Sequence, residues 1–270
     1  MKLIEAIKLL QDAGIDDPAY DAKEIFKTVG ALSPIDLISK NASASSDAVV
    51  KAIERRINRE PLQYIIGEVG FYREVYEVSR DCLIPRQDTE ILVDYAVKNI
   101  PSGETFIDLC TGSGCIAVST LKNTLNTSCL AVDISSPALS VAKRNAIKNG
   151  VSERVEFSLQ DALAYKPCGK VFAVLSNPPY VTESEYESLD KELYYEPKIA
   201  LVGNDNGLEF YKKITRNVKD FLKPGGFIAF EIGKDQGDAL AEIAEENQMQ
   251  ATILKDFSSH PRVAILKNTK

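Results

Sequence analysis

The chain has 270 residues and a net charge of −7, and 44% of its residues are hydrophobic and 26% are charged. This composition supports a buried core of ordinary size and lacks the basic excess typical of proteins that bind nucleic-acid phosphates. The single histidine, His260, leaves no histidine–cysteine metal cluster and argues against a histidine-based nucleophilic triad, and no apolar run reaches the roughly 18 residues that a membrane span needs.

Residues 1–65 predict a small helical domain. Ile4, Ile7 and Leu10 follow helical spacing in the opening segment MKLIEAIKLL. A secretion signal is also apolar, but this segment carries Glu5 and Lys8 and no small-residue cleavage site follows it. We therefore expect an amphipathic helix in a cytoplasmic protein, and we expect the five cysteines to be reduced thiols.

Three arginines cluster at the end of the last predicted helix of this domain, which covers residues 47–59. They are Arg55, Arg56 and Arg59. A cluster of this kind favours a solvated helix face, and a patch that binds a partner is the alternative.

The stretch 66–86 changes in character and predicts a β-hairpin that links two domains. Aromatic and β-branched residues are frequent along residues 71–78, as in short strands. We expect Phe71 to pack inside the hairpin, with a place in the wall of a pocket as the alternative.

A helix is expected to follow from about Asp88 to Lys98, with Asp88 as its N-cap and acidic residues in its first turn. The functional alternative is a loop that lies over a site and is formed by Arg86, Asp88, Thr89 and Glu90. Both interpretations are compatible with the sequence.

Apolar strands alternate with helices in the remainder of the domain assigned to residues 87–270, which predicts a mostly parallel sheet covered on both faces. The expected strands are 105–110, 128–134, 154–159, 171–177 and 226–233, and the expected helices are 115–124, 137–149, 207–222 and 235–247. Two last strands, 251–257 and 262–267, are separated by four residues, which is too short for a parallel crossover. The fold class is therefore α/β, a Rossmann-like sheet with a closing antiparallel strand.

A glycine-rich loop follows the strand that ends at residue 110. It reads Cys110-Thr111-Gly112-Ser113-Gly114, and the next strand ends at Asp133. Glycines let the backbone approach a ligand closely, and an acid at the end of the second strand can accept hydrogen bonds from both ribose hydroxyls of an adenosine.

Two ligands fit this loop. The residues also satisfy the dinucleotide fingerprint, so a dinucleotide-dependent oxidoreductase is one alternative. Asp108 stands directly before the loop, where we expect it to face an ammonium group, and the closing antiparallel strands are unlike a dinucleotide domain. These features favour S-adenosylmethionine. Asp161 follows the third strand, where an acceptor for the adenine amino group is expected, and a surface turn residue is the alternative.

The fourth strand ends in the tetrapeptide Asn177-Pro178-Pro179-Tyr180, which predicts the reaction site. The prolines stiffen the loop and hold Asn177 extended. The side-chain oxygen of Asn177 and the carbonyl of Pro178 can then accept both N–H bonds of a planar –NH₂ group, while Tyr180 offers a flat face. Binding both bonds orients a poorly nucleophilic amide nitrogen and stabilises positive charge that develops on it. A rigid turn without chemistry is the structural alternative.

At this point the sequence resembles the HemK-type (PrmC) protein-glutamine methyltransferases of class-I peptide chain release factors. The resemblance covers nearly the whole chain. Its most specific stretches are 59–67 (REPLQYIIG) and 83–90 (LIPRQDTE), and it also includes 108–114, 176–180, 196–201 and 207–211. The tetrapeptide alone is shared with adenine-N6 and other amino methyltransferases.

The resemblance implies a helical N-terminal domain, a hairpin linker and a Rossmann-like class I methyltransferase domain. It implies that residues 177–180 hold the glutamine of a Gly-Gly-Gln loop, with Asn177, Pro178 and Tyr180 as the catalytic set. It places the S-adenosylmethionine site at Asp108, residues 110–114, Asp133, Asp161, Ala162 and Asn177. It implies a release factor as partner and no metal, and we expect a monomer that binds neither nucleic acid nor membrane.

The sequence departs from the family pattern at a few positions, none of them within residues 177–180. Cys110 stands where glycine is common, and Gln87 replaces a usual proline. Ala162 occupies a position often held by an aromatic residue, and Asn204 and Asn206 depart from the usual loop residues. A glutamine methyltransferase of a ribosomal protein, a nucleic-acid adenine-N6 methyltransferase and a binding-only module remain as alternatives.

Overall fold

The structure, a computed structural model, describes residues 1–39, 42–44 and 46–268. The chain divides into two compact units. The first combines Met1–Glu68 with Asp190–Tyr195, and the second combines Val69–Leu189 with Glu196–Lys270. None of the helices in the described ranges combines the length and the apolarity that crossing a bilayer requires.

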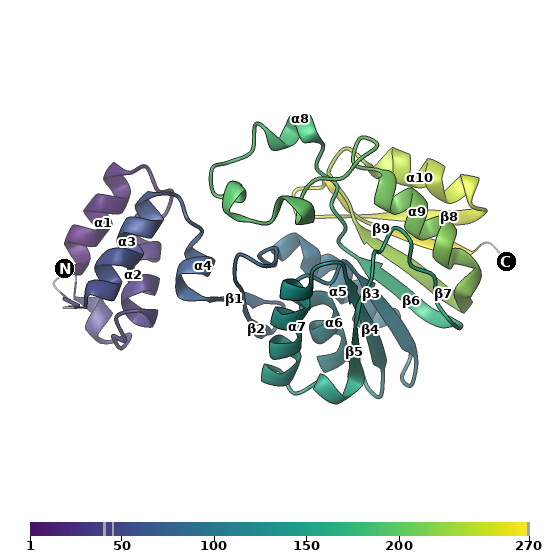
Figure 1. The fold of residues 1–270 in the computed structure, drawn as a ribbon, viewed down its shortest axis with the longest axis horizontal. Helices are drawn as coiled ribbons and strands as arrows, with labels where there is room; N and C mark the ends of the chain where they lie inside the picture. The colour runs from purple at the N-terminus through teal and green to yellow at the C-terminus, as the bar shows by residue number, and fades with distance from the viewer. Residues whose placement is uncertain (40–41, 45, 269–270) are drawn as a thin grey trace. The chain divides into compact units, whose positions relative to one another are not determined.

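The first unit is helical, as the sequence predicts. Its helices α1 to α3 pack together through apolar faces, and a short fourth helix follows (Figure 1). Their bounds are α1 Leu3–Asp12, α2 Pro18–Thr28, α3 Asp47–Ile57 and α4 Leu62–Ile66, with a 3₁₀ turn η1 at Asp36–Ile38. Asp17 caps α2 by accepting from the backbone N–H of Tyr20 at 3.1 Å, and Ser46 caps α3.

Each of the three arginines at the end of α3 has a partner within the first unit, and of the three only Arg56 is buried while Arg55 remains exposed. Arg56 is buried and pairs with Asp21 at 2.6 Å and with Glu192 at 2.8 Å. Arg55 forms a bidentate pair with Glu60, both distances being 2.8 Å. The guanidinium of Arg59 donates to the carbonyls of residues 13 and 14. Helical spacing does not reveal these partners, because they lie on other segments.

A β-hairpin follows, as predicted, from β1 (Glu68–Phe71) and β2 (Glu74–Glu77). Phe71 is 3% exposed and packs edge-on against Tyr76, with ring centroids 5.8 Å apart. The packing interpretation of Phe71 is therefore confirmed.

The second unit is built on a seven-stranded sheet in the order β5-β4-β3-β6-β7-β9-β8. Strands β5, β4, β3, β6 and β7 pair in parallel, and β9 is antiparallel to both β7 and β8. The bounds are β3 Thr105–Leu109, β4 Ser128–Asp133, β5 Val155–Leu159, β6 Val171–Ser176, β7 Leu222–Glu231, β8 Met249–Lys255 and β9 Pro261–Asn268. The predicted α/β fold with its antiparallel end is confirmed.

Helices cover both faces of this sheet because successive strand residues point to opposite sides. In β3, Phe106 joins the core under α5 and α6, whereas Ile107 joins the core under α9 and α10. The helix bounds are α5 Glu90–Asn99, α6 Cys115–Lys122, α7 Ser136–Lys148, α8 Glu183–Tyr186, α9 Glu209–Val218 and α10 Gly237–Glu246. The ends of all these parallel strands meet along one edge, where α6 and α7 begin (Figure 1).

Two local predictions differ from the structure. Strand β7 begins at Leu222 rather than at residue 226, because the Pro-Gly-Gly segment continues the strand through an irregular register instead of ending it. Helix α5 begins at Glu90 with Thr89 in the N-cap position, so Asp88 is not its N-cap. Asp88 lies in the preceding 3₁₀ turn η2 (Gln87–Thr89), and its carboxylate pairs with Arg262 at 3.2 Å.

Candidate active site

The glycine-rich loop connects β3 to α6 and turns sharply, with positive φ at Cys110 (60°), Gly112 (53°) and Gly114 (80°). Gly112 and Gly114 are required for different structural reasons. A side chain at Gly112 would meet nothing within 4 Å, whereas one at Gly114 would lie 3.0 Å from the Cβ of Ala142. Gly112 therefore leaves space beside the loop, and Gly114 permits close packing of α6 on α7. Cys110 adopts a conformation that glycine tolerates better.

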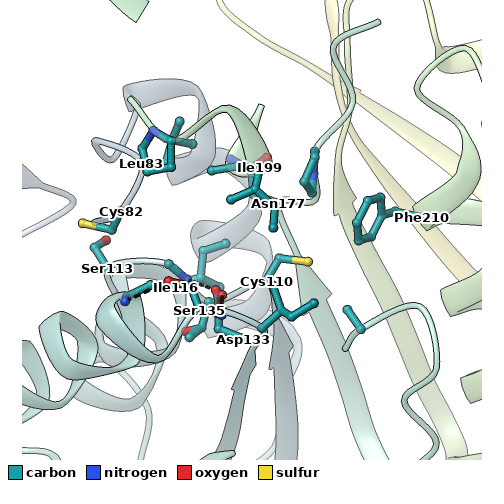
Figure 2. Close-up of a pocket in the computed structure, with 18 of the residues that line it drawn as sticks. Cys82, Leu83, Cys110, Ser113, Ile116, Asp133, Ser135, Asn177, Ile199 and Phe210 are labelled. Atoms are coloured by element: carbon teal, nitrogen blue, oxygen red, sulfur yellow. Dashed lines mark hydrogen bonds between the residues drawn. The ribbon is translucent and has the colours of Figure 1, made fainter. Parts of the chain in front are cut away.

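Asp133, at the end of β4, is fixed beside this loop by two backbone hydrogen bonds. Its Oδ2 accepts from the N–H of Gly112 at 2.8 Å and its Oδ1 from the N–H of Ser135 at 2.9 Å (Figure 2). Burial raises the pKa of this carboxyl group. Each oxygen retains lone-pair capacity, so the carboxylate can still accept two further hydrogen bonds from a ligand.

Asp108 is placed differently from our expectation. Its side chain is fully buried and does not line the pocket. The Oδ2 atom accepts from the Thr111 hydroxyl at 2.6 Å and from the N–H of Ala117 at 3.1 Å, while Oδ1 has no partner within the described residues. Burial raises the pKa of Asp108 to about 7. Asp108 therefore braces the loop from inside the protein.

A pocket of about 280 Å³ opens at the ends of the strands. Its walls come from six parts of the chain, which are residues 81–89, 110–116, 133–138, 161–163, 177–179 and 197–210. All of them belong to the second unit. Of the predicted site residues, those that line the pocket are Cys110, Thr111, Gly112, Ser113, Asp133, Asp161, Ala162, Asn177 and Pro179.

One end of the pocket is formed by residues 161–163 and by the start of α9. Asp161 Oδ1 accepts from the backbone N–H of Leu163 at 2.8 Å, and Ala162 is 5% exposed. The aromatic residue at this end is Phe210, in the first turn of α9 (Figure 2). The sequence analysis did not identify Phe210, because nothing in the helical pattern of α9 distinguishes it from a core residue.

Another wall of the pocket is formed by the turn 177–180 after β6. The Ser176 hydroxyl donates to the carbonyl of Leu109 at 2.7 Å and ties this turn to the end of β3. Asn177 and Pro179 line the pocket, whereas Pro178 and Tyr180 are not among the lining residues. Tyr180 directs its hydroxyl toward Glu231, at 3.3 Å from Oε1.

Two glycines that the sequence analysis did not select lie directly behind this turn. A side chain at Gly203 would lie 2.4 Å from the carbonyl oxygen of Pro179, and one at Gly207 would lie 2.1 Å from that of Tyr180. The two segments also exchange backbone hydrogen bonds, from Val181 N–H to Leu201 and from Gly203 N–H to Val181, each 2.9 Å. The turn is therefore held by a second backbone in contact with it.

A buried carboxylate joins two walls of the pocket opening. Glu196 is 5% exposed, accepts from the backbone N–H of Ile84 at 2.9 Å and forms an ion pair with Arg86. The pair fixes residues 82–86 against residues 196–202, which together form one side of the opening. This contact gives Arg86 a structural role at the site.

The sequence matches the Methyltransferase small domain family over residues 87–206 and the PrmC N-terminal domain family over residues 2–67. It is 38% identical over 261 residues to a release factor glutamine methyltransferase of Thermodesulfovibrio yellowstonii, with 93% of this chain and 92% of that protein covered. The chain belongs to the release factor glutamine methyltransferase family. The resemblance noted in the sequence is thereby confirmed.

Two further relatives extend this result. A bifunctional methyltransferase of Rickettsia typhi is 37% identical over 281 residues, covering 94% of this chain and 54% of that protein. The chain thus spans about half the length of that relative. A solved ribosomal protein L11 methylase from Lactobacillus delbrueckii subsp. bulgaricus aligns with a TM-score of 0.54 and 19% identity over 73% of this chain and 87% of that one, and it supports the fold.

Membership of this family makes the chain an S-adenosylmethionine-dependent methyltransferase. The residues present fit that cofactor. Gly112 leaves open space beside the loop, and Asp133 presents a fixed carboxylate to the pocket. Ala162 and Phe210 line the same pocket as this loop.

Proposed function

We propose that this enzyme transfers a methyl group from S-adenosylmethionine to the side-chain amide nitrogen, N5, of the glutamine in the Gly-Gly-Gln loop of class-I peptide chain release factors. The observation that carries the proposal is the orientation of Asn177 beside the pocket. Its Nδ2 donates to the Thr89 hydroxyl at 3.5 Å, so its Oδ1 is left to accept a hydrogen bond.

S-Adenosylmethionine supplies an electrophilic methyl group when it is bound. We propose that Asp133 accepts from its ribose hydroxyls, while residues 110–114 lie along its methionine part and Asp161 with Ala162 lies at its adenine. Asp108 supports this loop from inside. The geometry in favour of these roles is the convergence of the loop, Asp133 and residues 161–163 on one pocket.

An amide nitrogen is a poor nucleophile because its lone pair is delocalised into the carbonyl group. We propose that Asn177 Oδ1 and the Pro178 carbonyl accept the two N–H bonds of the substrate glutamine, and that Pro179 and Tyr180 shape the turn around it. These acceptors orient the nitrogen and stabilise the positive charge that develops as it is methylated. The nitrogen then releases a proton to solvent, because an N-protonated amide is strongly acidic.

We further propose that residues 1–65 recognise the substrate protein, that residues 66–86 act as a linker, and that residues 87–270 carry the chemistry. The enzyme is proposed to act in the cytoplasm, as a monomer, without nucleic acid. The substrate proposal is supported by the relatives whose names include release factor methylation and whose similarity extends over both parts of the chain.

The proposal is tested by incubating the enzyme and labelled S-adenosylmethionine with a class-I release factor and locating the added methyl group by mass spectrometry. Asn177→Ala is expected to lower kcat at least about 100-fold, because one of two acceptors is lost, while affinity for S-adenosylhomocysteine stays within about threefold. Methylation of a ribosomal protein or of DNA in place of the release factor would contradict the substrate assignment. Turnover of Asn177→Ala near that of the wild type would contradict the site.

A cofactor control accompanies this assay. S-Adenosylhomocysteine should raise the melting temperature of the enzyme, whereas NAD should leave it unchanged, because only a ligand that binds the native state stabilises it. The reverse result would favour a dinucleotide-dependent oxidoreductase.

A further inference from the structure

A buried carboxylate lies behind the turn 177–180 and contacts two segments of the site at once. Glu231, the last residue of β7, is 2% exposed. Its Oε2 accepts from the Thr89 hydroxyl at 2.5 Å, and its Oε1 accepts from the Tyr180 hydroxyl at 3.3 Å. Glu231 does not line the pocket. Neither the sequence pattern nor the proposed chemistry gives this residue a role.

The hydrogen bonds from Glu231 to the pocket have a fixed direction. The Thr89 hydroxyl donates its single proton to Glu231 Oε2. Toward Asn177 the Thr89 oxygen can then only accept, and it lies 3.5 Å from Nδ2. The amide of Asn177 is thereby turned with its –NH₂ end to Thr89 and its oxygen away from Thr89.

We propose that Glu231 is a positioning residue for methyl transfer, which acts through Thr89 to decide which end of the Asn177 amide faces the substrate. The inference rests on the proposed function, in which Asn177 Oδ1 accepts a hydrogen bond from the substrate –NH₂ group. If the Asn177 amide were flipped, its –NH₂ group would face the –NH₂ group of the substrate glutamine. Asn177 Oδ1 could then no longer accept the substrate hydrogen bond. The Tyr180 hydroxyl bonds the second oxygen and holds the same carboxylate from the far side of the turn.

The surroundings of Glu231 act on its ionisation in both directions. Burial raises the pKa of Glu231, and the guanidinium of Arg262 acts in the opposite direction, as do the hydrogen bonds from Thr89 and Tyr180. Arg262 is itself held by Asp88 at 3.2 Å and Asp256 at 3.1 Å. A carboxylate suits this position better than an amide, because an amide also donates and would allow the opposite hydrogen-bond direction.

The test compares two substitutions of Thr89. Thr89→Val keeps the shape of the side chain and removes the hydroxyl, so kcat with the release factor should fall about 10- to 100-fold while KM for S-adenosylmethionine stays within about threefold. Thr89→Ser restores the hydroxyl and should recover kcat to within about threefold of the wild type. Equal losses in the two variants would overturn the inference, as would an unchanged kcat in Thr89→Val.

The chain offers a matched control for the substitution itself. Thr215, in α9, is also fully buried, and its hydroxyl has no hydrogen-bond partner among the described residues. Thr215→Val makes the same change of atoms away from the site and should leave kcat unchanged.

If Thr89→Val fails to fold, Glu231→Gln is the variant to be tested in its place. A fall in kcat in that variant with retained S-adenosylhomocysteine binding supports the inference, and an unchanged kcat overturns it.

A second readout needs no substrate protein. The side-chain –NH₂ signals of Asn177 are observed by ¹H–¹⁵N NMR with bound S-adenosylhomocysteine and assigned by their loss in Asn177→Asp. Thr89→Val should shift these signals, and Thr89→Ser and Thr215→Val should not. This readout separates the substrate assignment from the positioning role of Glu231. If the release factor is not methylated but the Asn177 signals shift as predicted, only the substrate assignment is contradicted. If the Asn177 signals do not shift in Thr89→Val, the positioning role is contradicted.

Discussion

Two parts of the site, the glycine-rich loop with Asp133 (the cofactor end) and the turn 177–180 (the acceptor end), are held in different ways. At the cofactor end, Asp133 fixes the glycine-rich loop through the backbone N–H groups of Gly112 and Ser135. At the acceptor end, the turn 177–180 is supported by side chains and backbone from three separate segments, at Thr89, Gly207 and Glu231. The first end is local to two adjacent strands, whereas the second depends on the assembly of distant parts. We therefore expect substitutions at the cofactor end to lower cofactor affinity, and substitutions at the acceptor end to lower the rate of methyl transfer.

The largest expected effect is at the acceptor end, at a residue that touches neither ligand. In Gly207→Ala the new Cβ would lie 2.1 Å from the Tyr180 carbonyl oxygen, and φ is +77°, so the turn must move. Methyl transfer should fall at least about 100-fold, because a displacement of about 1 Å in a catalytic group has this cost. S-Adenosylhomocysteine affinity, measured by calorimetry, should stay within about threefold of the wild-type value.

Gly103→Ala is the control for backbone strain in this comparison. Gly103 also has a positive φ, +84°, but a side chain there would meet nothing within 4 Å. The control should lose about 1 kcal/mol of folding stability and no activity. Equal activity in the two variants would show that the glycine contact does not hold the turn.

The next effect is at the cofactor end. Asp133→Ala removes a carboxylate proposed to accept from two ribose hydroxyls, and such bonds contribute about 1.5–3 kcal/mol each. Affinity for S-adenosylhomocysteine should fall about 100-fold or more. The Asn177 side-chain signals should keep their wild-type positions, since the acceptor end is supported separately. Cofactor affinity within about threefold of the wild type would contradict the assignment of Asp133.

The smallest effect concerns stability and pH at the cofactor loop. The pKa of Asp108 is raised from 3.8 to about 7 by burial, so the folded state keeps a proton that the unfolded state loses between these values. Stability therefore falls as pH rises through this window, by about 2–3 kcal/mol between about pH 5 and about pH 7. Asp108→Asn cannot titrate and should lack this contribution.

Denaturant unfolding of the two proteins at several pH values measures the difference directly. The wild type should lose stability relative to Asp108→Asn as pH rises, and the difference should level off above about pH 7. A constant difference across this range would mean that Asp108 is ionised in the folded protein throughout.

The sequence predicted the cofactor end better than the acceptor end. The residues of the cofactor end come from adjacent strands, whereas the acceptor end is supported by distant parts of the chain. The strand, the glycines and Asp133 lie in register along one stretch of chain, so periodicity and spacing place them together. The turn 177–180 was visible by its prolines. Its supports were not, because Gly203, Gly207 and Glu231 are joined to it only by the folded topology.

One of these supports, Glu231, nevertheless left a signal that can be used in other sequences. Glu231 is an acid within the otherwise apolar strand segment 226–232, and such a residue is buried with partners or is functional. In the first unit Arg56 left a similar signal, because it follows Val49 and Ile53 at helical spacing and so lies on the buried face of α3.

The position of β9 has a consequence for how this protein is made. β9 is synthesised after β8, yet it lies between β7 and β8, and β8 pairs with β9 alone. During translation β8 is therefore synthesised before β9, the strand with which it pairs. The part of the sheet beyond β7 can form only after β9 has been synthesised. Arg262, beside Glu231 and bonded to Asp88, arrives with the same late strand. The residues of the nucleotide loop are synthesised well before this strand, so the part of the sheet around Glu231 is the last to receive its full set of neighbours.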